Sequence, residues 1–304
     1  MRHRRKRRLS TTLVVVAALL VLAAVGLASR VFVPSLTGAS TSVSGFYLDV
    51  GASSSLGFQP TGIVHHNGHR TNTGYANDVV AAEKAKGITL LLRQVGCPGE
   101  TAESMLGGGD HCYTLPKRQL PVAVSFLRAN TNAVGLVTID LGFNDVRPCL
   151  MNATVNSACA TQGIAYVRTD LPKVLAQLTS AAGPHVHFVG LEYADPFLAH
   201  YLKGGASVTA ATQSLNVMTA LDNTLDAAYT AAHIPIANVP GIYQSANLNS
   251  TPLAHVGAVP RNVANVCAMT WMCTPPPWGP DDHPNNLGYK AIAQMIVAKL
   301  PTTW

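Results

Sequence analysis

Charged residues are scarce in this sequence, and several short motifs that would indicate a function are missing from it. Only 12% of the 304 residues are charged and 6% are aromatic, whereas 48% are hydrophobic. No Gly-x-Ser-x-Gly elbow occurs, which argues against the α/β-hydrolase fold. No Cys-x-x-Cys pair occurs either, and the glycine run 107–109 is not followed by the lysine of a phosphate-binding loop. We therefore expect no metal site and no cofactor.

The excess of positive charge is confined to the N-terminus. The formal net charge is +6, and six basic residues lie in the first eight positions: Arg2, Arg4, Arg5, Lys6, Arg7 and Arg8. The rest of the chain is close to neutral, so the basic isoelectric point does not predict nucleic-acid binding. An uncharged apolar stretch from Leu13 to Ala28 follows, which is the layout of a secretory leader or a membrane anchor. Gly26-Leu27-Ala28 fits a cleavage site, so the secreted and the anchored form both stay open.

The remaining chain is long enough for one domain with a sizeable core. We expect a signal peptide or membrane anchor at residues 1–28, a flexible spacer rich in Ser, Thr and Gly at residues 29–44, and a single folded domain at residues 45–304. No internal repeat is found. A monomer is expected.

Short apolar runs alternate with amphipathic stretches along this domain. The predicted strands are residues 46–50, 89–95, 135–141, 186–192 and 234–239, and the predicted helices are residues 75–86, 120–130, 163–180, 208–233 and 287–300. Such alternation is typical of a parallel sheet covered on both faces. We therefore expect a three-layer α/β/α sandwich with a parallel, flavodoxin-like sheet of five strands.

Three short polar segments carry the chemistry. Gly51-Ala52-Ser53 follows the first predicted strand, Gly142-Phe143-Asn144-Asp145 follows the third, and Asp281-Asp282-His283-Pro284 lies near the C-terminus. In parallel sheets, ligands bind at the carboxyl ends of the strands. Acyl transfer needs a hydroxyl nucleophile, an imidazole base, a carboxylate and donors for the oxyanion. The three segments supply all of these, which predicts a dispersed serine-hydrolase site.

The order of these segments resembles that of the SGNH, or GDSL-type, hydrolases, and the resemblance extends from Tyr47 to the last helix. The segment 47–60 is similar to the first block of actinobacterial members, and the segment 96–101 is similar to the second. The resemblance implies an exported esterase or lipase. One departure is Ala52, because the family usually has Asp at this position.

Ser53 is the expected nucleophile and His283 the expected base, since imidazole has a pKa suited to proton transfer near neutral pH. The family commonly places its Asp three residues before the His, where this chain has Pro280. The acid is therefore Asp281 or Asp282, and we favour Asp281, because a side chain two residues back can point the same way as the ring. The resemblance further implies an oxyanion hole made of the Ser53 N–H, the Gly99 N–H and the Asn144 amide. It also implies a loop-orienting role for Asp145.

Six cysteines in an exported chain indicate three disulfides. Proximity in the sequence favours the pairs Cys97 with Cys112, Cys149 with Cys159, and Cys267 with Cys273. Each pair closes a short loop beside a site segment. Next to the last pair, Trp271, Met272, Trp278 and the prolines 275–277 form either an apolar lip for an acyl chain or packing around the Cys267 loop.

These features predict an exported serine esterase or lipase that hydrolyses carboxylic esters through an acyl-enzyme. The substrate is expected to be a lipid or an acylated saccharide, and the protein is expected outside the cytoplasm, secreted or attached to the membrane by its N-terminal segment. Two alternatives stay open. Ala52 favours a catalytically weak, SGNH-like binding protein of the cell envelope, and the same chemistry would also serve an O-acyltransferase acting on an envelope polysaccharide.

Overall fold

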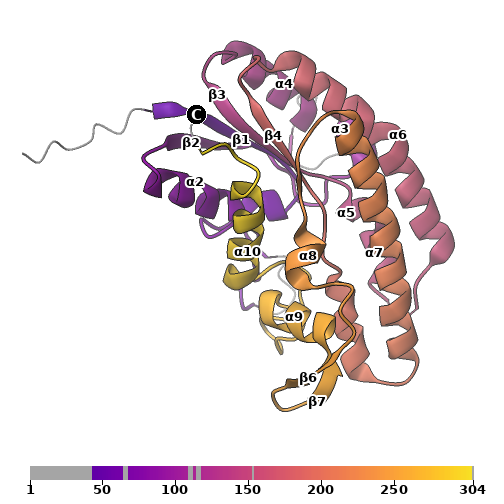
Figure 1. Ribbon diagram of the computed structural model, residues 1–304. Helices are drawn as coiled ribbons and strands as arrows, with labels where there is room; N and C mark the ends of the chain where they lie inside the picture. Colours follow the sequence, from indigo (N-terminus) through magenta and orange to yellow (C-terminus); the bar gives the residue numbers. More distant parts are fainter. Residues whose placement is uncertain (1–42, 64–67, 109–111, 114–117, 153, 303–304) are drawn as a thin grey trace, which may run out of the picture. The chain divides into compact units, whose positions relative to one another are not determined.

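Five parallel strands form the central sheet of the computed structural model, which describes residues 43–63, 68–108, 112–113, 118–152 and 154–302 (Figure 1). The strands are β1 (Val43–Gly51), β2 (Thr89–Gln94), β3 (Val134–Asp140), β4 (His187–Leu191) and β5 (Ile236–Ala237). Their order is β2-β1-β3-β4-β5, and every pair is parallel. This is the flavodoxin-like order, so the predicted fold class is confirmed.

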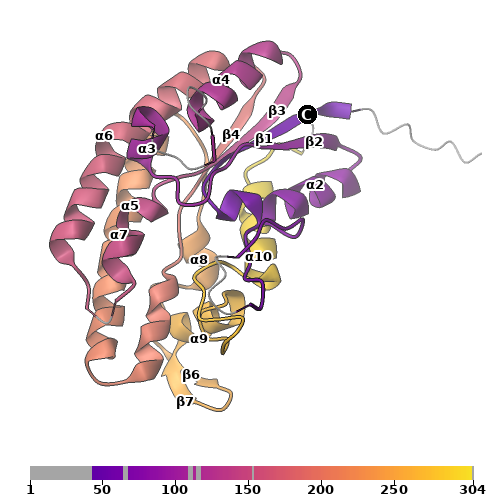
Figure 2. The same cartoon turned by 180° about the vertical axis from the view of Figure 1, so that it is seen from behind.

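Helices cover both faces of this sheet, which explains why β3 is buried along its whole length. One face packs against α3 (Ala102–Gly107), α4 (Gln119–Ala129), α5 (Phe143–Leu150), α6 (Ser157–Ala181) and α7 (Ala206–Ala231). The other face packs against α2 (Tyr75–Ala85), the 3₁₀ helix η2 (Pro196–Lys203), α8 (Val239–Tyr243), α9 (Arg261–Met269) and α10 (Asn286–Val297). Figures 1 and 2 show α6 and α7 on one side of the sheet and α2 and α10 on the other.

Alternate residues of the strands enter the two cores. On β1, Tyr47 belongs to the core under α2 and α10, whereas Leu48 belongs to the core under α4 and α6. On β3, Leu136 and Val137 divide in the same way. This period of two is the reason that a short, nearly continuous apolar run becomes a strand buried on both faces.

The first two residues of β1, Val43 and Ser44, fall within the range predicted as spacer. The predicted leader at residues 1–28 and the spacer up to residue 42 lie outside the described residues. Within the described ranges, no helix is both long and apolar enough to cross a membrane. The described residues all belong to one compact unit.

Several short elements were not predicted: the 3₁₀ turn η1 (Ser54–Leu56), α3, α5, η2, α8, α9, and the hairpin of β6 (Ser250–Leu253) and β7 (Gly257–Pro260). In addition, α6 begins at Ser157, six residues before the predicted start. Three disulfides join Cys97 to Cys112, Cys149 to Cys159 and Cys267 to Cys273. This pairing is the one that proximity in the sequence favours.

Candidate active site

The turn that carries Ser53 is attached to the end of β3. Ser53 caps η1 directly after β1, and its backbone has φ −64° and ψ −36°. Gly51 has φ +155°, and a Cβ built there would lie 2.3 Å from the carbonyl oxygen of Asp140, so only glycine permits this close approach. The N–H of Ala52 donates to the same carbonyl oxygen at 3.1 Å. The position of Ser53 is thereby determined by β3 as well as by β1.

Ser53, His283 and Asp281 form one hydrogen-bonded chain. The Nε2 atom of His283 lies 2.8 Å from Ser53 Oγ, and its Nδ1 atom lies 2.8 Å from Asp281 Oδ1. The backbone N–H of His283 also donates to Asp281 Oδ1, at 2.9 Å. The segment is held in place on its other side by Asn285, whose side chain caps α10. This is the geometry of a nucleophile, a base and an acid.

The neighbouring Asp282 points elsewhere. Its carboxylate makes a salt bridge with the Arg147 guanidinium on α5, and its Oδ1 lies 3.8 Å from His283 Nδ1, too far for a hydrogen bond. Sequence reasoning did not identify Arg147. The two adjacent aspartates therefore have different partners.

Opposing effects act on the pKa of each member of the pair. Burial lowers the pKa of His283, but the hydrogen bond and charge of Asp281 and the charge of Asp282 outweigh burial and the Arg147 charge, so the pKa lies above its ordinary value. Burial raises the pKa of Asp281, yet the hydrogen bonds from His283 and the charges of His283 and Arg147 bring it below its ordinary value. Asp281 is thus ionised at neutral pH and stabilises a protonated imidazole.

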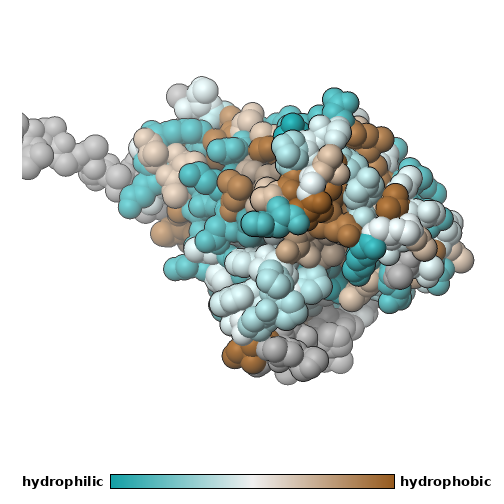
Figure 3. Space-filling view, turned by 90° about the horizontal axis from the view of Figure 1, so that it is seen from below, coloured by the Kyte–Doolittle hydropathy of each residue, from teal (hydrophilic) through white to brown (hydrophobic). Residues whose placement is uncertain are grey.

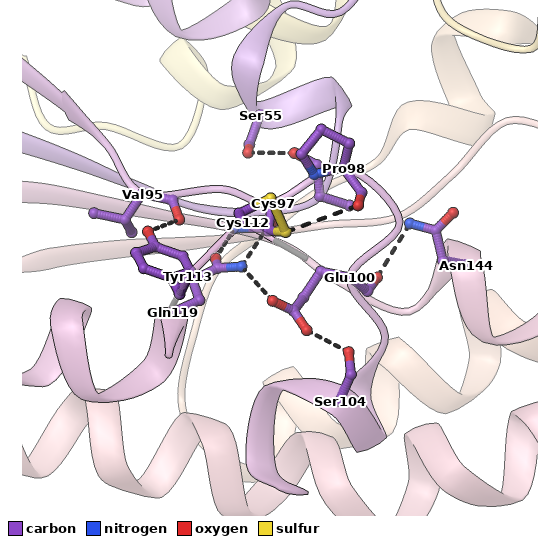
Figure 4. Close-up of a disulfide and its surroundings, with 12 residues drawn as sticks. Ser55, Val95, Cys97, Pro98, Glu100, Ser104, Cys112, Tyr113, Gln119 and Asn144 are labelled. Atoms are coloured by element: carbon purple, nitrogen blue, oxygen red, sulfur yellow. Dashed lines mark hydrogen bonds between the residues drawn. A yellow bond between two sulfur atoms is a disulfide. The ribbon is translucent and has the colours of Figure 1, made fainter. Parts of the chain in front are cut away.

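The loop after β2 contributes Gly99. This residue has φ +82°, and a Cβ built there would meet no atom of the described residues within 4 Å. Within the described residues, neither the Ser53 nor the Gly99 N–H donates a hydrogen bond. Asn144, in the first turn of α5, donates to the Glu100 carbonyl at 3.1 Å (Figure 4). Its amide therefore lies at the same loop as Gly99, with a second N–H left over.

Two further side chains fix the position of this loop. Asp145 accepts the N–H of Ala102 at the start of α3, at 3.0 Å, and thus joins α5 to the loop. Gln119 exchanges hydrogen bonds with the Gly51 backbone at 2.8 and 2.9 Å and donates to the Glu100 carboxylate at 2.9 Å (Figure 4). Gln119 and Glu100 were missed by sequence reasoning. They connect the nucleophile turn to the Gly99 loop.

One cluster among the described residues has the composition of a metal site, namely Asp281, Asp282 and His283. Its geometry does not favour a cation, because His283 Nδ1 is bonded to Asp281 and the guanidinium of Arg147 already neutralises Asp282. A cation there would have to displace both partners. The arrangement therefore fits a triad better than a metal centre.

A cleft of about 540 Å³ opens beside Asp281 and Asp282. Its apolar lining includes Met151, Phe197, Leu202, Met272, Pro275 and Pro276, with Arg147, His200 and Lys203 as its basic residues. Trp271 and Trp278 instead stack on each other, with ring centroids 6.0 Å apart. Of the aromatic and proline-rich group, Met272 and two prolines thus face the cleft. On the face shown in Figure 3, hydrophobic side chains gather in the middle among hydrophilic ones.

No protein-family model and no curated protein matches this sequence. Solved structures with a similar fold include two from Streptomyces. An extracellular lipase from Streptomyces rimosus has a TM-score of 0.56 and 17% identity, over 84% of this chain and 100% of the lipase. A phospholipase A1 from Streptomyces albidoflavus has a TM-score of 0.51 and 15% identity, over 85% of this chain and 100% of the phospholipase. These likenesses support the predicted fold, a three-layer α/β/α sandwich.

Proposed function

We propose that this chain, which has the SGNH hydrolase fold, is an exported serine esterase or lipase that hydrolyses carboxylic esters through an acyl-enzyme. The observation that carries the proposal is the continuous hydrogen-bonded chain from Ser53 through His283 to Asp281, with 2.8 Å at both side-chain steps. A capping serine beside a buried histidine needs no such arrangement. A hydrolytic serine does.

In the acylation half, Ser53 Oγ attacks the ester carbonyl carbon and His283 Nε2 takes the hydroxyl proton. The negative charge on the carbonyl oxygen is received by the N–H groups of Ser53 and Gly99 and by the Asn144 amide. When the tetrahedral intermediate collapses, His283 gives the proton to the departing alkoxide. An alcohol leaves, and the acyl group stays bound to Ser53 Oγ.

In the deacylation half, a water molecule replaces the alcohol. His283 takes a proton from this water as the water oxygen attacks the acyl carbon. His283 then gives the proton to Ser53 Oγ when the carboxylic acid leaves. Asp281 stays ionised throughout and stabilises the imidazolium in both halves. A sugar hydroxyl in place of water would turn the same steps into acyl transfer.

The surroundings of the site support an ester with an apolar acyl part. The cleft of about 540 Å³ beside Asp281 has a mostly apolar lining, as is typical of ligand sites. The two similar structures are described as a lipase and a phospholipase A1. Three disulfides support a location outside the cytoplasm. Attachment to the membrane through residues 1–28, if they are not cleaved, is part of the proposal.

Covalent labelling tests this function. We expect a fluorophosphonate probe to label Ser53, and the oxidised protein to hydrolyse p-nitrophenyl butyrate. The Ser53→Ala variant should lose both activities, whereas Ser54→Ala, which removes the adjacent hydroxyl, should keep both. If the wild-type protein resists the probe and leaves the ester intact, the envelope binding protein suggested by Ala52 becomes the better interpretation.

A further inference from the structure

A buried carboxylate that the triad does not use lies directly behind the nucleophile turn. Asp140 is the last residue of β3 and pairs in register with Gly51 of β1. Its side chain is only 1% exposed. Its backbone accepts the Ala52 N–H, and its Cβ would be 2.8 Å from a Cβ built on Gly51. Asp140 is therefore packed, through its backbone and its Cβ, against the turn that presents Ser53.

The Asp140 side chain has one strong hydrogen bond and one open oxygen. Its Oδ1 accepts the Tyr193 hydroxyl at 2.5 Å, while its buried Oδ2 makes no hydrogen bond within the described part of the chain. Asp140 also lines a partly open pocket of about 50 Å³, together with Ser54, Asp282 and Pro284. This pocket therefore reaches both η1, next to Ser53, and the segment that holds His283.

Electrostatic effects also connect Asp140 to His283 and to the turn that carries Ser53. Burial raises the pKa of Asp140 to about 6, against the Tyr193 hydrogen bond, the charge of His283 and the smaller effects of the nearby Ser55 N–H and Tyr75 hydroxyl, all of which lower it. Asp140 is therefore ionised over most of the pH range in which His283 is a neutral base. The other titratable groups that feel its charge lie on β1, α2, α7 and α10: Tyr47, Asp49, Tyr75, Tyr229 and Tyr289.

We propose that Asp140 is a positioning residue of this site: its carboxylate, buried behind the turn that presents Ser53, adds negative charge that favours the protonated form of His283. A carboxylate is thereby present beside the nucleophile turn although residue 52 is alanine. Asp281 and Asp282 are the carboxylates whose charges mainly raise the pKa of His283, so we expect a smaller effect in the same direction from Asp140, whose own pKa is lowered by the charge of His283. The catalytic part of this proposal rests on the proposed function.

The Asp140→Asn variant removes the charge and keeps the shape. Its kcat for p-nitrophenyl butyrate should fall about tenfold, with KM unchanged, if Asp140 acts through His283 and not through binding of the ester. The pKa of His283, measured by NMR of the imidazole, should fall by about half a pH unit. Asp49→Asn is the matched control, since Asp49 is also fully buried and bonded to a tyrosine and a threonine. That control should change neither kcat nor the pKa of His283.

Tyr193→Phe keeps the Asp140 carboxylate but removes the hydrogen bond that it accepts from the Tyr193 hydroxyl. Because the Tyr193 hydrogen bond lowers the pKa of Asp140, its loss should move the acid limb of kcat upward and leave full activity at pH 9. Asp140→Asn should not recover at any pH. If Asp140→Asn fails to fold, Tyr193→Phe still decides the question through its pH profile.

The proposal is overturned if Asp140→Asn lowers only the melting temperature, as Asp49→Asn would, or if Tyr193→Phe leaves the pH profile unchanged. An inactive, unlabelled wild-type protein would instead remove the proposed function. The NMR comparison needs no turnover, so an unaltered pKa of His283 in Asp140→Asn would then still count against the positioning role.

Discussion

Two adjacent aspartates precede His283, and only Asp281 contacts its ring. The reason is local. Asp281 Oδ1 accepts both the backbone N–H and the ring Nδ1 of His283, so the carboxylate closes a turn over the two following residues and meets the imidazole from the same side. Asp282 cannot do this, and its charge is bound to Arg147 instead.

Because Asp281 and Asp282 have different partners, the substitutions Asp281→Asn and Asp282→Asn should have unequal effects. Asp281→Asn should lower kcat by roughly 10³- to 10⁴-fold, because the imidazolium loses its partner and the ring its orientation. Asp282→Asn should lower kcat far less. Since the charge of Asp282 raises the pKa of His283, its removal should move the acid limb of kcat/KM to lower pH. Rate profiles between pH 5 and 9 would check both, and a silent Asp281→Asn with an inactive Asp282→Asn would reverse the assignment.

The sequence was sufficient to predict that Ser53, His283 and Asp281 meet, because their segments resemble those of the SGNH hydrolases and lie directly after a strand or before a helix. It was not sufficient for Arg147, Gln119, Tyr193 and Asp140. Their roles arise from how α5, α4 and the chain after β4 pack against the turn, which no local pattern records. One signal was available, namely an Asp that ends the apolar run of β3. An Asp at the buried end of such a strand is rarely found without a partner.

At the scale of helices and strands, all five predicted strands are present, because a continuous apolar run between polar turns has few other interpretations. Short helices were missed for physical reasons. In α5, a turn motif opens the helix and Pro148 lies within it, so the sequence resembles a loop. In α6, the N-cap Asn156 starts the helix well before its apolar stripe becomes regular.

The loop between β2 and α3 offers a test of the oxyanion assignment. Gly99→Ala should cost stability through its φ of +82°, without a steric clash. If the Gly99 N–H receives the oxyanion, kcat should also fall by about a hundredfold. Gly87→Ala is the matched control, because Gly87 has φ +86° and equally open surroundings before β2. Equal losses of melting temperature, with a loss of kcat in Gly99→Ala alone, would support the assignment. Equal activity in both variants would contradict it.

At the scale of the whole molecule, the few charged residues are unevenly placed. Several carboxyl groups are buried in the described part of the chain, and burial raises the pKa of Asp145 and Asp195 to about 7 and that of Asp222 to about 8. Each of these carboxyl groups accepts a hydrogen bond from a backbone N–H. Asp145 accepts it from Ala102, Asp195 from Phe197, and Asp222 from Tyr193. Asp145 thereby joins α5 to α3, Asp222 joins α7 to the chain after β4, and Asp195 caps η2. The fold therefore binds protons that the unfolded chain releases near pH 4.

This excess of bound protons predicts that the protein is less stable at pH 8 than at pH 5. Between the unfolded and the folded pKa of such a carboxyl, the folded state holds more protons, so the free energy of unfolding falls as pH rises. The raised pKa of His283 acts in the same direction above its ordinary value. Melting temperatures by circular dichroism should thus decrease from pH 5 to 8. Asp222→Asn, which cannot ionise at this position, should flatten the decrease. A melting temperature that rises over this range in the wild-type protein would show that these carboxyls are ionised in the fold.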